Sequence, residues 1–149
     1  ISRIRLKMLF FICLSSVDPT LGKVNKESFS DETLIELAVQ NVTNMNVITQ
    51  LNGKPVEISE WAGIARDPSG RIVGIEWSAC EMEGSFDLRW LPFALRAIRL
   101  SENRLEGSLD LTELPETLKI LWVRDNALSG EICLTQLPGQ MIGLGASEN

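Results

Sequence analysis

The second half of the chain repeats itself every 23 residues. Three kinds of residue keep this spacing. They are the pairs Leu91-Pro92, Leu114-Pro115 and Leu137-Pro138, the asparagines Asn103, Asn126 and Asn149, and the glycines Gly84, Gly107 and Gly130. Because three independent residue types share one register, each unit is predicted to be one element that stacks on the next and forms a solenoid.

Each unit begins with the two-residue period of a β-strand. In "LRAIRLS", Ile98 and Leu100 fall on one face and Arg99 on the other. Repetition predicts parallel strands about 4.8 Å apart, with the leucines buried against the next turn. Asn103 follows the strand at an expected bend, where its amide can pair with backbone groups that burial would otherwise leave unpaired.

The opposite side of the solenoid is predicted to be extended or turn-like. In "GSLDLTELP", Leu109 and Leu111 alternate inward around Asp110. This stretch begins with Gly107 and ends with Pro115, and these two residues exclude a long helix. The solenoid is therefore expected to be thin.

The unit L-x-x-L-x-L-x-x-N-x-L-x-G-x-L-x-L-x-x-L-P-x-x resembles a leucine-rich repeat. The resemblance implies a mainly β, α/β-type right-handed solenoid, with a parallel sheet on its concave face and extended or turn segments on its convex side. The units are 72–94, 95–117, 118–140 and 141–149. In the first unit, Trp77 stands for a strand leucine and Cys80 for the asparagine. The last unit stops early, so we expect the sequence to be a fragment.

Residues 23–71 are predicted to form a helix-plus-hairpin cap over the first edge of the core. "SDETLIELAVQNV" predicts a helix over about 31–43, with a Ser or Asp N-cap. The apolar residues of its buried face are Leu34, Ile35, Ala38 and Val42. The pair 52–53 predicts one hairpin, and the turn 67–70 predicts another, which pairs a strand from Trp61 with the first repeat strand.

The cap also resembles the N-terminal caps of plant-type and protist surface leucine-rich-repeat proteins. Their W-x-G-V-x-C motif matches Trp61, Gly63 and Ile64, but Arg66 stands where those caps have the cysteine. The resemblance therefore implies a cap without that disulfide, in which packing of Trp61 closes the edge.

Residues 1–22 have the order of a secretory signal peptide. Basic residues at positions 3, 5 and 7 precede an apolar run over 8–14, and small residues lead to a predicted cleavage point before Lys23. The alternatives are a buried strand, or translated upstream sequence with Met8 as the true start. A transmembrane helix needs about 20 apolar residues, more than this run contains.

The composition argues against several classes of function. The formal net charge of -6 disfavours nucleic acid as a partner. The absence of histidine removes the commonest general base and the commonest metal ligand. The three cysteines are too far apart for a zinc site. We therefore expect neither an enzyme nor a bound cofactor or metal.

The repeat dictates its leucines, asparagines and glycines, so a partner is expected at the outward strand positions. These are Gly74, Glu76 and Ser78, then Ala97, Arg99 and Ser101, then Ile120, Trp122 and Arg124, and then Gly143, Gly145 and Ser147. An exposed tryptophan beside arginines has the composition of a binding hot spot. We predict Glu76, Arg99, Trp122 and Arg124 as partner-binding residues. The alternative is that the Trp122 ring only stacks on Arg99.

Two residues outside this set carry separate predictions. Trp90 occupies a position that is polar in the other units, and we expect it to cover the outer surface or the cap; contact with a ligand is the alternative. Asn41-Val42-Thr43 is an N-glycosylation acceptor if the chain is secreted, with Asn41 as the modified residue.

Two main functions are compatible with the sequence. The first is a non-catalytic recognition module, secreted or at the cell surface, that binds a protein or glycan ligand through the concave sheet. The second is the scaffold of a larger receptor or regulator whose signalling or kinase domain lies beyond residue 149. A third hypothesis is a degenerate fragment without independent function. The cytoplasm is the alternative location, and a membrane is expected only through a C-terminal anchor or an uncleaved N-terminal segment.

Overall fold

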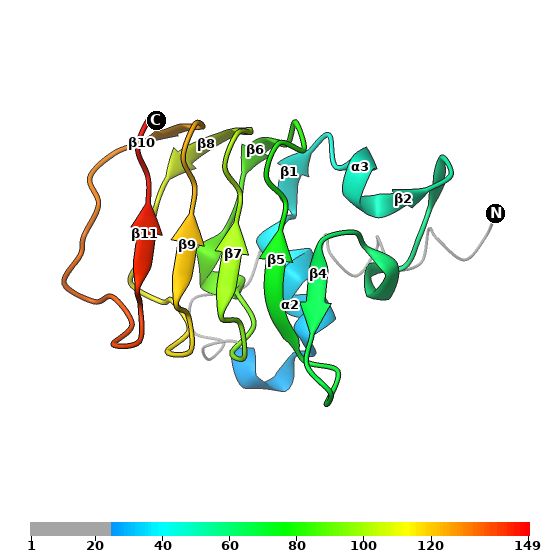
Figure 1. Cartoon of the computed structure of the whole chain (residues 1–149), viewed down its shortest axis with the longest axis horizontal. Coiled ribbons are helices and arrows are strands. Elements are labelled where there is room, and N and C mark those ends of the chain that lie inside the picture. Colours follow the sequence, from blue (N-terminus) through cyan, green and yellow to red (C-terminus); the bar gives the residue numbers. More distant parts are fainter. Residues whose placement is uncertain (1–24) are drawn as a thin grey trace, which may run out of the picture.

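The computed structural model describes residues 25–149, and the signal peptide expected over 1–22 lies outside the described residues. Residues 25–149 form a solenoid with one sheet on each side of a shared core, and helices and a hairpin cover one end (Figure 1). This is the mainly β solenoid that the repeat predicts.

The front sheet contains the strand of every repeat. Its strands are β4 (Ile64–Arg66), β5 (Ile72–Glu76), β7 (Ala97–Arg99), β9 (Ile120–Trp122) and β11 (Gly143–Gly145), in the spatial order β11-β9-β7-β5-β4. Pairing from β5 through β11 is parallel, whereas β4 pairs antiparallel with β5. The antiparallel strand covers the cap side of the sheet, and it begins at Ile64 rather than at Trp61 as expected.

The back sheet lies on the opposite side of the core. Its strands are β1 (Asn41–Thr43), β6 (Glu83–Ser85), β8 (Arg104–Ser108) and β10 (Ala127–Ser129), in the order β1-β6-β8-β10. The last three are parallel, and β1 is antiparallel to β6. The predicted extended outer side is thus confirmed, with one short 3-10 helix, η4 (Leu88–Trp90), in the first repeat.

The remaining elements belong to the cap. They are η2 (Lys26–Ser28), α2 (Asp31–Ala38), α3 (Asn46–Thr49), β2 (Gln50–Leu51), β3 (Lys54–Pro55) and η3 (Ile58–Glu60). Ser30 caps α2 by accepting a hydrogen bond from the Thr33 N–H at 3.2 Å. No helix within residues 25–149 is long and apolar enough to cross a bilayer.

The helix expected over 31–43 is wrong in its second half, because α2 ends at Ala38. Val42 lies in β1 instead, opposite Gly84 of β6, and its half-buried side chain packs on the core from there. The helical period alone could not show this, because pairing with β6 satisfies the same backbone groups that a longer helix would satisfy.

The inward residues of successive strands form one continuous core. Ile98 and Leu100 are buried, and so are Leu121 and Val123 one repeat later. Burial of one such side chain stabilises the fold by about 1.5 to 3 kcal/mol. The two-residue period predicted from the sequence is therefore confirmed, and it leaves the odd-numbered neighbours of Ile98 on the outer face of the front sheet.

Asn103 joins two successive turns of the solenoid at the bend after β7. Its Oδ1 accepts hydrogen bonds from the N–H groups of Cys80 (3.1 Å) and Met82 (3.0 Å). Its Nδ2 donates to the carbonyl oxygens of Trp77 and Leu100, both at 2.9 Å. The equivalent asparagines of the next two repeats also bond across turns. The structural role predicted for these residues is confirmed.

Aromatic rings close the cap edge of the core. Trp77 is fully buried, its ring centroid lies 6.2 Å from that of Trp61, and its Nε1 donates to the Ala62 carbonyl at 2.7 Å. Gly63 permits this close approach, because a Cβ at that position would collide with the carbonyl oxygen of Glu76. Trp61 therefore packs at the edge, as the resemblance implied.

Arg66, in the position of the cap cysteine, connects α2 to β4 by an ion pair. Its Nη1 lies 2.8 Å from Glu32 Oε1 and 2.9 Å from the Gly70 carbonyl oxygen. The pKa of the Glu32 carboxyl is lowered by a hydrogen bond from its own backbone N–H, against the opposing effect of burial, and further by Arg66. The Ile72 N–H also donates to Asp31 at 2.7 Å. Polar contacts thus connect the cap helix to the first strands.

Candidate functional site

The four predicted contact residues lie together on the front sheet. Parallel pairing aligns Glu76 with Arg99, Arg99 with Trp122, and Trp122 with Gly145. Arg124 follows Trp122 by two residues and therefore lies on the same face. One row across three repeats thus contains the carboxylate of Glu76, the guanidinium of Arg99 and the indole of Trp122. The guanidinium of Arg124 lies beside this row.

The Trp122 ring stacks on a guanidinium group that is itself held in place. The Cζ of Arg99 lies 4.8 Å from the centroid of the ring, and its Nη1 lies 3.5 Å from Glu76 Oε2. Oε1 of the same carboxylate accepts a hydrogen bond from Ser78 Oγ at 2.7 Å. The stacking considered as an alternative to binding is present. It leaves 42% of Trp122 exposed, so the ring is both ordered and accessible.

Two glycines on β11 leave room for the neighbouring side chains. A Cβ on Gly143 would lie 3.5 Å from Trp122 Nε1. A Cβ on Gly145 would lie 3.3 Å from Cγ and Cδ of Arg124 and 3.4 Å from Trp122 Cδ1. A Cβ on Gly145 would therefore press against Arg124, whereas a Cβ at either position would be in ordinary contact with the indole. Gly145 thus lets Arg124 lie close over β11.

Arg124 points toward the C-terminal end of the front sheet. Its Nε donates to Ser147 Oγ at 2.9 Å, and its Nη2 lies 3.8 Å from Glu148 Oε1. The pKa of Glu148 is raised, first by a side-chain hydrogen bond with Asp125 and then by repulsion between the two carboxylates. Glu148 therefore lies close both to Asp125 and to Arg124.

An open hollow of about 730 Å³ lies over these rows. It is lined by Glu76, Ser78, Arg99, Ser101, Glu102, Trp122, Arg124, Asp125 and Gly145. The sequence prediction missed Glu102 and Asp125. The sequence did contain a pattern that could have identified them, because each directly precedes a repeat asparagine. They share a backbone φ between 52° and 59° with Ala79 and Glu148 at the same repeat position. This conformation turns the chain at the end of each strand, and three of these four positions carry a carboxylate.

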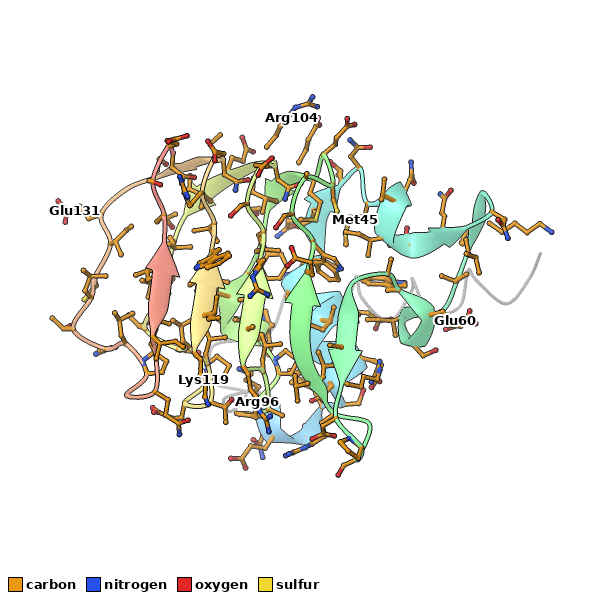
Figure 2. The ribbon with its side chains drawn as sticks, in the orientation of Figure 1. Met45, Glu60, Arg96, Arg104, Lys119 and Glu131 are labelled. Atoms are coloured by element: carbon orange, nitrogen blue, oxygen red, sulfur yellow. The ribbon has the colours of Figure 1, made fainter. Side chains whose placement is uncertain are left out.

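The two edges of the front sheet differ in charge. Arg96 and Lys119 directly precede β7 and β9, and Figure 2 shows both at the lower edge of the sheet. Glu102 and Asp125 follow the opposite ends of the same strands. The hollow lies toward the acidic edge, because the two carboxylates line it and the two basic residues do not.

Trp90 and Asn41 lie away from the front sheet. The ring of Trp90 packs edge-on against Phe29, with 6.2 Å between centroids, so Trp90 covers the cap side as expected. Asn41 is exposed in β1, at the edge of the back sheet. The predicted glycosylation acceptor and the predicted contact rows are thus on different sheets.

The hollow supplies groups for recognition by stacking and hydrogen bonding. It offers one indole face, two guanidinium groups, two hydroxyls and three carboxylates. In the part of the chain that the structure describes, no group of three or more Cys, Asp or Glu side chains is arranged to hold a metal ion. Aromatic surface surrounded by charged hydrogen-bonding groups fits a peptide or a sugar.

No protein-family model matches this sequence, and no curated protein matches it. Solved structures do. The BIR2 ectodomain from Arabidopsis thaliana is similar with a TM-score of 0.57 at 21% identity, over 70% of this chain and 60% of that chain. A chain of the BIR3–SERK2 complex from Arabidopsis thaliana is similar with a TM-score of 0.50 at 20% identity, over 78% of this chain and 81% of that chain.

This chain therefore spans about 60% of the BIR2 ectodomain that it matches. At such low identity the likeness shows the fold and nothing finer. Together with the 23-residue units and the cross-turn asparagines, it establishes the fold of this chain as a leucine-rich-repeat solenoid.

Proposed function

We propose that this chain is a non-catalytic recognition module, secreted or at the cell surface, that binds a protein or glycan ligand through its front sheet. Glu76, Arg99, Trp122 and Arg124 are the proposed contact residues. The observation that carries the proposal is the exposed Trp122 ring, held by Arg99 over an open hollow. An ordered aromatic ring loses little conformational entropy on binding, which favours it as an anchor.

The similar structures support the proposal in a general way. One is an ectodomain, and the other is a complex between two proteins, BIR3 and SERK2. The ectodomain agrees with an extracellular location, and the complex agrees with a protein ligand. The signal-like order of residues 1–22 supports the same location.

Binding to an array of purified extracellular proteins and glycans tests the proposal, followed by a comparison of two double variants. Trp122→Ala with Arg99→Ala should abolish or strongly weaken binding of every ligand found. The matched control is Ile132→Ala with Arg104→Ala, because Ile132 is also 42% exposed and both residues lie outside the hollow. If only the control variant loses binding, the front sheet is not the contact surface.

The location is tested separately by peptide mass mapping of the cellular protein. A mature N-terminus near Lys23, and a mass increase at Asn41 that the Asn41→Gln variant lacks, are expected for a secreted chain. An intact N-terminal segment on the cellular protein, with unmodified Asn41, would contradict passage through the secretory route.

A further inference from the structure

The charges of the hollow indicate which kind of partner it fits, and this inference rests on the proposed function. Both cationic residues that line it have acidic neighbours. Arg99 lies 3.5 Å from Glu76, and Arg124 lies 3.8 Å from Glu148. Arg124 also donates to Ser147, so its guanidinium is directed toward β11. Neither cation is left as a free positive group for an acidic ligand.

Glu102 and Asp125, by contrast, carry negative charge without a cationic partner. Among the ion pairs of residues 25–149, neither carboxylate takes part in one. Arg104, which begins β8 of the back sheet and which Figure 2 shows at the top of the molecule, pairs with Glu83 at 2.9 Å. The acidic edge of the hollow therefore keeps a net negative charge that a partner can neutralise.

The two carboxylates occupy the same position in successive repeats. Neighbouring strands lie about 4.8 Å apart, so one guanidinium or ammonium group can contact both. Trp122 lies on the strand that leads into Asp125, and 42% of this apolar residue is exposed. In an extended segment, alternate side chains point to one face about 7 Å apart.

From this arrangement we infer that the front sheet binds an extended protein segment in which an arginine or lysine and an apolar or aromatic residue point to the same side. The basic side chain lies between Glu102 and Asp125, and the apolar side chain packs on Trp122. An acidic segment is repelled at the same edge, and a neutral oligosaccharide gains nothing from the two carboxylates.

Two capped synthetic heptapeptides test this inference on the full chain. One presents arginine and phenylalanine on one face with serine between them, and the other has glutamate in place of each arginine. Calorimetric titration at low salt should show binding of the arginine peptide, about tenfold or more tighter than its glutamate counterpart. Raising the salt concentration should reduce the difference.

The Glu102→Gln and Asp125→Asn double variant should bind the arginine peptide about tenfold more weakly than the wild type. The control is Glu106→Gln with Glu131→Gln, which removes the same charge from exposed positions outside the hollow and should leave binding unchanged. The Trp122→Ala variant should lose affinity for both peptides.

Three results overturn the inference. They are equal or tighter binding of the glutamate peptide, unchanged affinity in the acidic double variant, and tight binding of a neutral oligosaccharide with no binding of the arginine peptide. If Trp122→Ala still weakens a ligand found in the array, the proposed function stands and only the partner chemistry is wrong. If no front-sheet variant affects the binding of any ligand, both the proposed function and the inferred partner chemistry are wrong.

Discussion

At the scale of single residues, the repeat asparagines do most to hold neighbouring turns together. Asn103 is 8% exposed and satisfies two N–H groups and two carbonyl groups that lie inside the bend. A buried backbone group without a partner costs about 1 to 3 kcal/mol. No other side chain of the same size offers a donor and an acceptor together in this way, so the position tolerates few substitutions.

Asn103→Ala is expected to lower the free energy of unfolding by about 1 to 3 kcal/mol, because the Cys80 and Met82 N–H groups lose their acceptor. Chemical denaturation of the purified chain measures the change. Glu106→Ala, an exposed substitution in the same repeat, should change stability by less than about 0.5 kcal/mol. Equal effects of the two substitutions would mean that the cross-turn bonds are not important for stability.

At the scale of elements, the cap is attached on both sides of the core. On the back, β1 lies antiparallel along β6, and on the front, α2 contacts β4 and β5 through polar side chains. Each attachment depends on one residue that contacts the cap directly. These are Gly84, which lies against β1, and Arg66, which reaches α2.

Gly84→Ala should destabilise the chain more than Gly107→Ala, although both residues have φ near +90° and the same place in the repeat. A Cβ on Gly84 would collide with the carbonyl oxygen of Asn41, whereas a Cβ on Gly107 would meet only Ser85 Cβ at 3.6 Å. The strain of the positive φ is common to both variants. The difference in their stability is therefore due to the contact between residue 84 and β1. Thermal unfolding of the two variants measures this difference, and identical midpoints would contradict the close packing of β1 against Gly84.

The Glu32 carboxylate, which accepts a hydrogen bond from its own backbone N–H and pairs with Arg66, makes the cap sensitive to acid. The folded state lowers the pKa of Glu32, so its contribution to stability is present above about pH 4.3 and is lost as the pH falls through the lowered value. Urea unfolding between pH 6 and pH 3 should show that Glu32→Gln is less stable than the wild type at pH 6 and that the gap narrows toward pH 3. The control Glu36→Gln, an exposed site on the same helix, should change the free energy of unfolding at pH 6 by less than about 0.5 kcal/mol.

At the scale of the whole molecule, the described residues share one apolar core. Buried residues run without interruption from Ile35 in the cap to Val123 after β9. In a solenoid each turn contacts only its neighbours, so the strength of the interfaces between turns decides whether it unfolds as one unit. A continuous core with asparagines bonded across each turn favours a single unit.

The full chain is therefore expected to unfold in one cooperative transition. Tryptophan fluorescence, to which the buried Trp77 of the cap edge contributes, and far-ultraviolet circular dichroism, which reports all strands, should give the same midpoint. A broad transition, or an earlier midpoint in one of the two signals, would show that the cap and the repeats unfold separately and would favour the degenerate-fragment hypothesis.

The sequence by itself determined the repeat, the inward and outward strand residues and the role of the asparagines. It could do so because a period of 23 residues imposes the same neighbours on every turn. It also placed Glu76, Arg99 and Trp122 in one row, since register follows from the period. It did not reveal the end of α2 at Ala38 or the strand at Asn41–Thr43, because these depend on pairing with β6.

Only the tertiary structure decided the electrostatics of the front sheet. The acidic residues Glu102 and Asp125 look like ordinary solvated side chains in a chain of net charge -6. Their meaning depends on which cations are already paired, and those pairs form between side chains of different repeats. A one-dimensional period fixes which residues are neighbours, but not where long flexible side chains point, because that is settled by contacts across the folded surface.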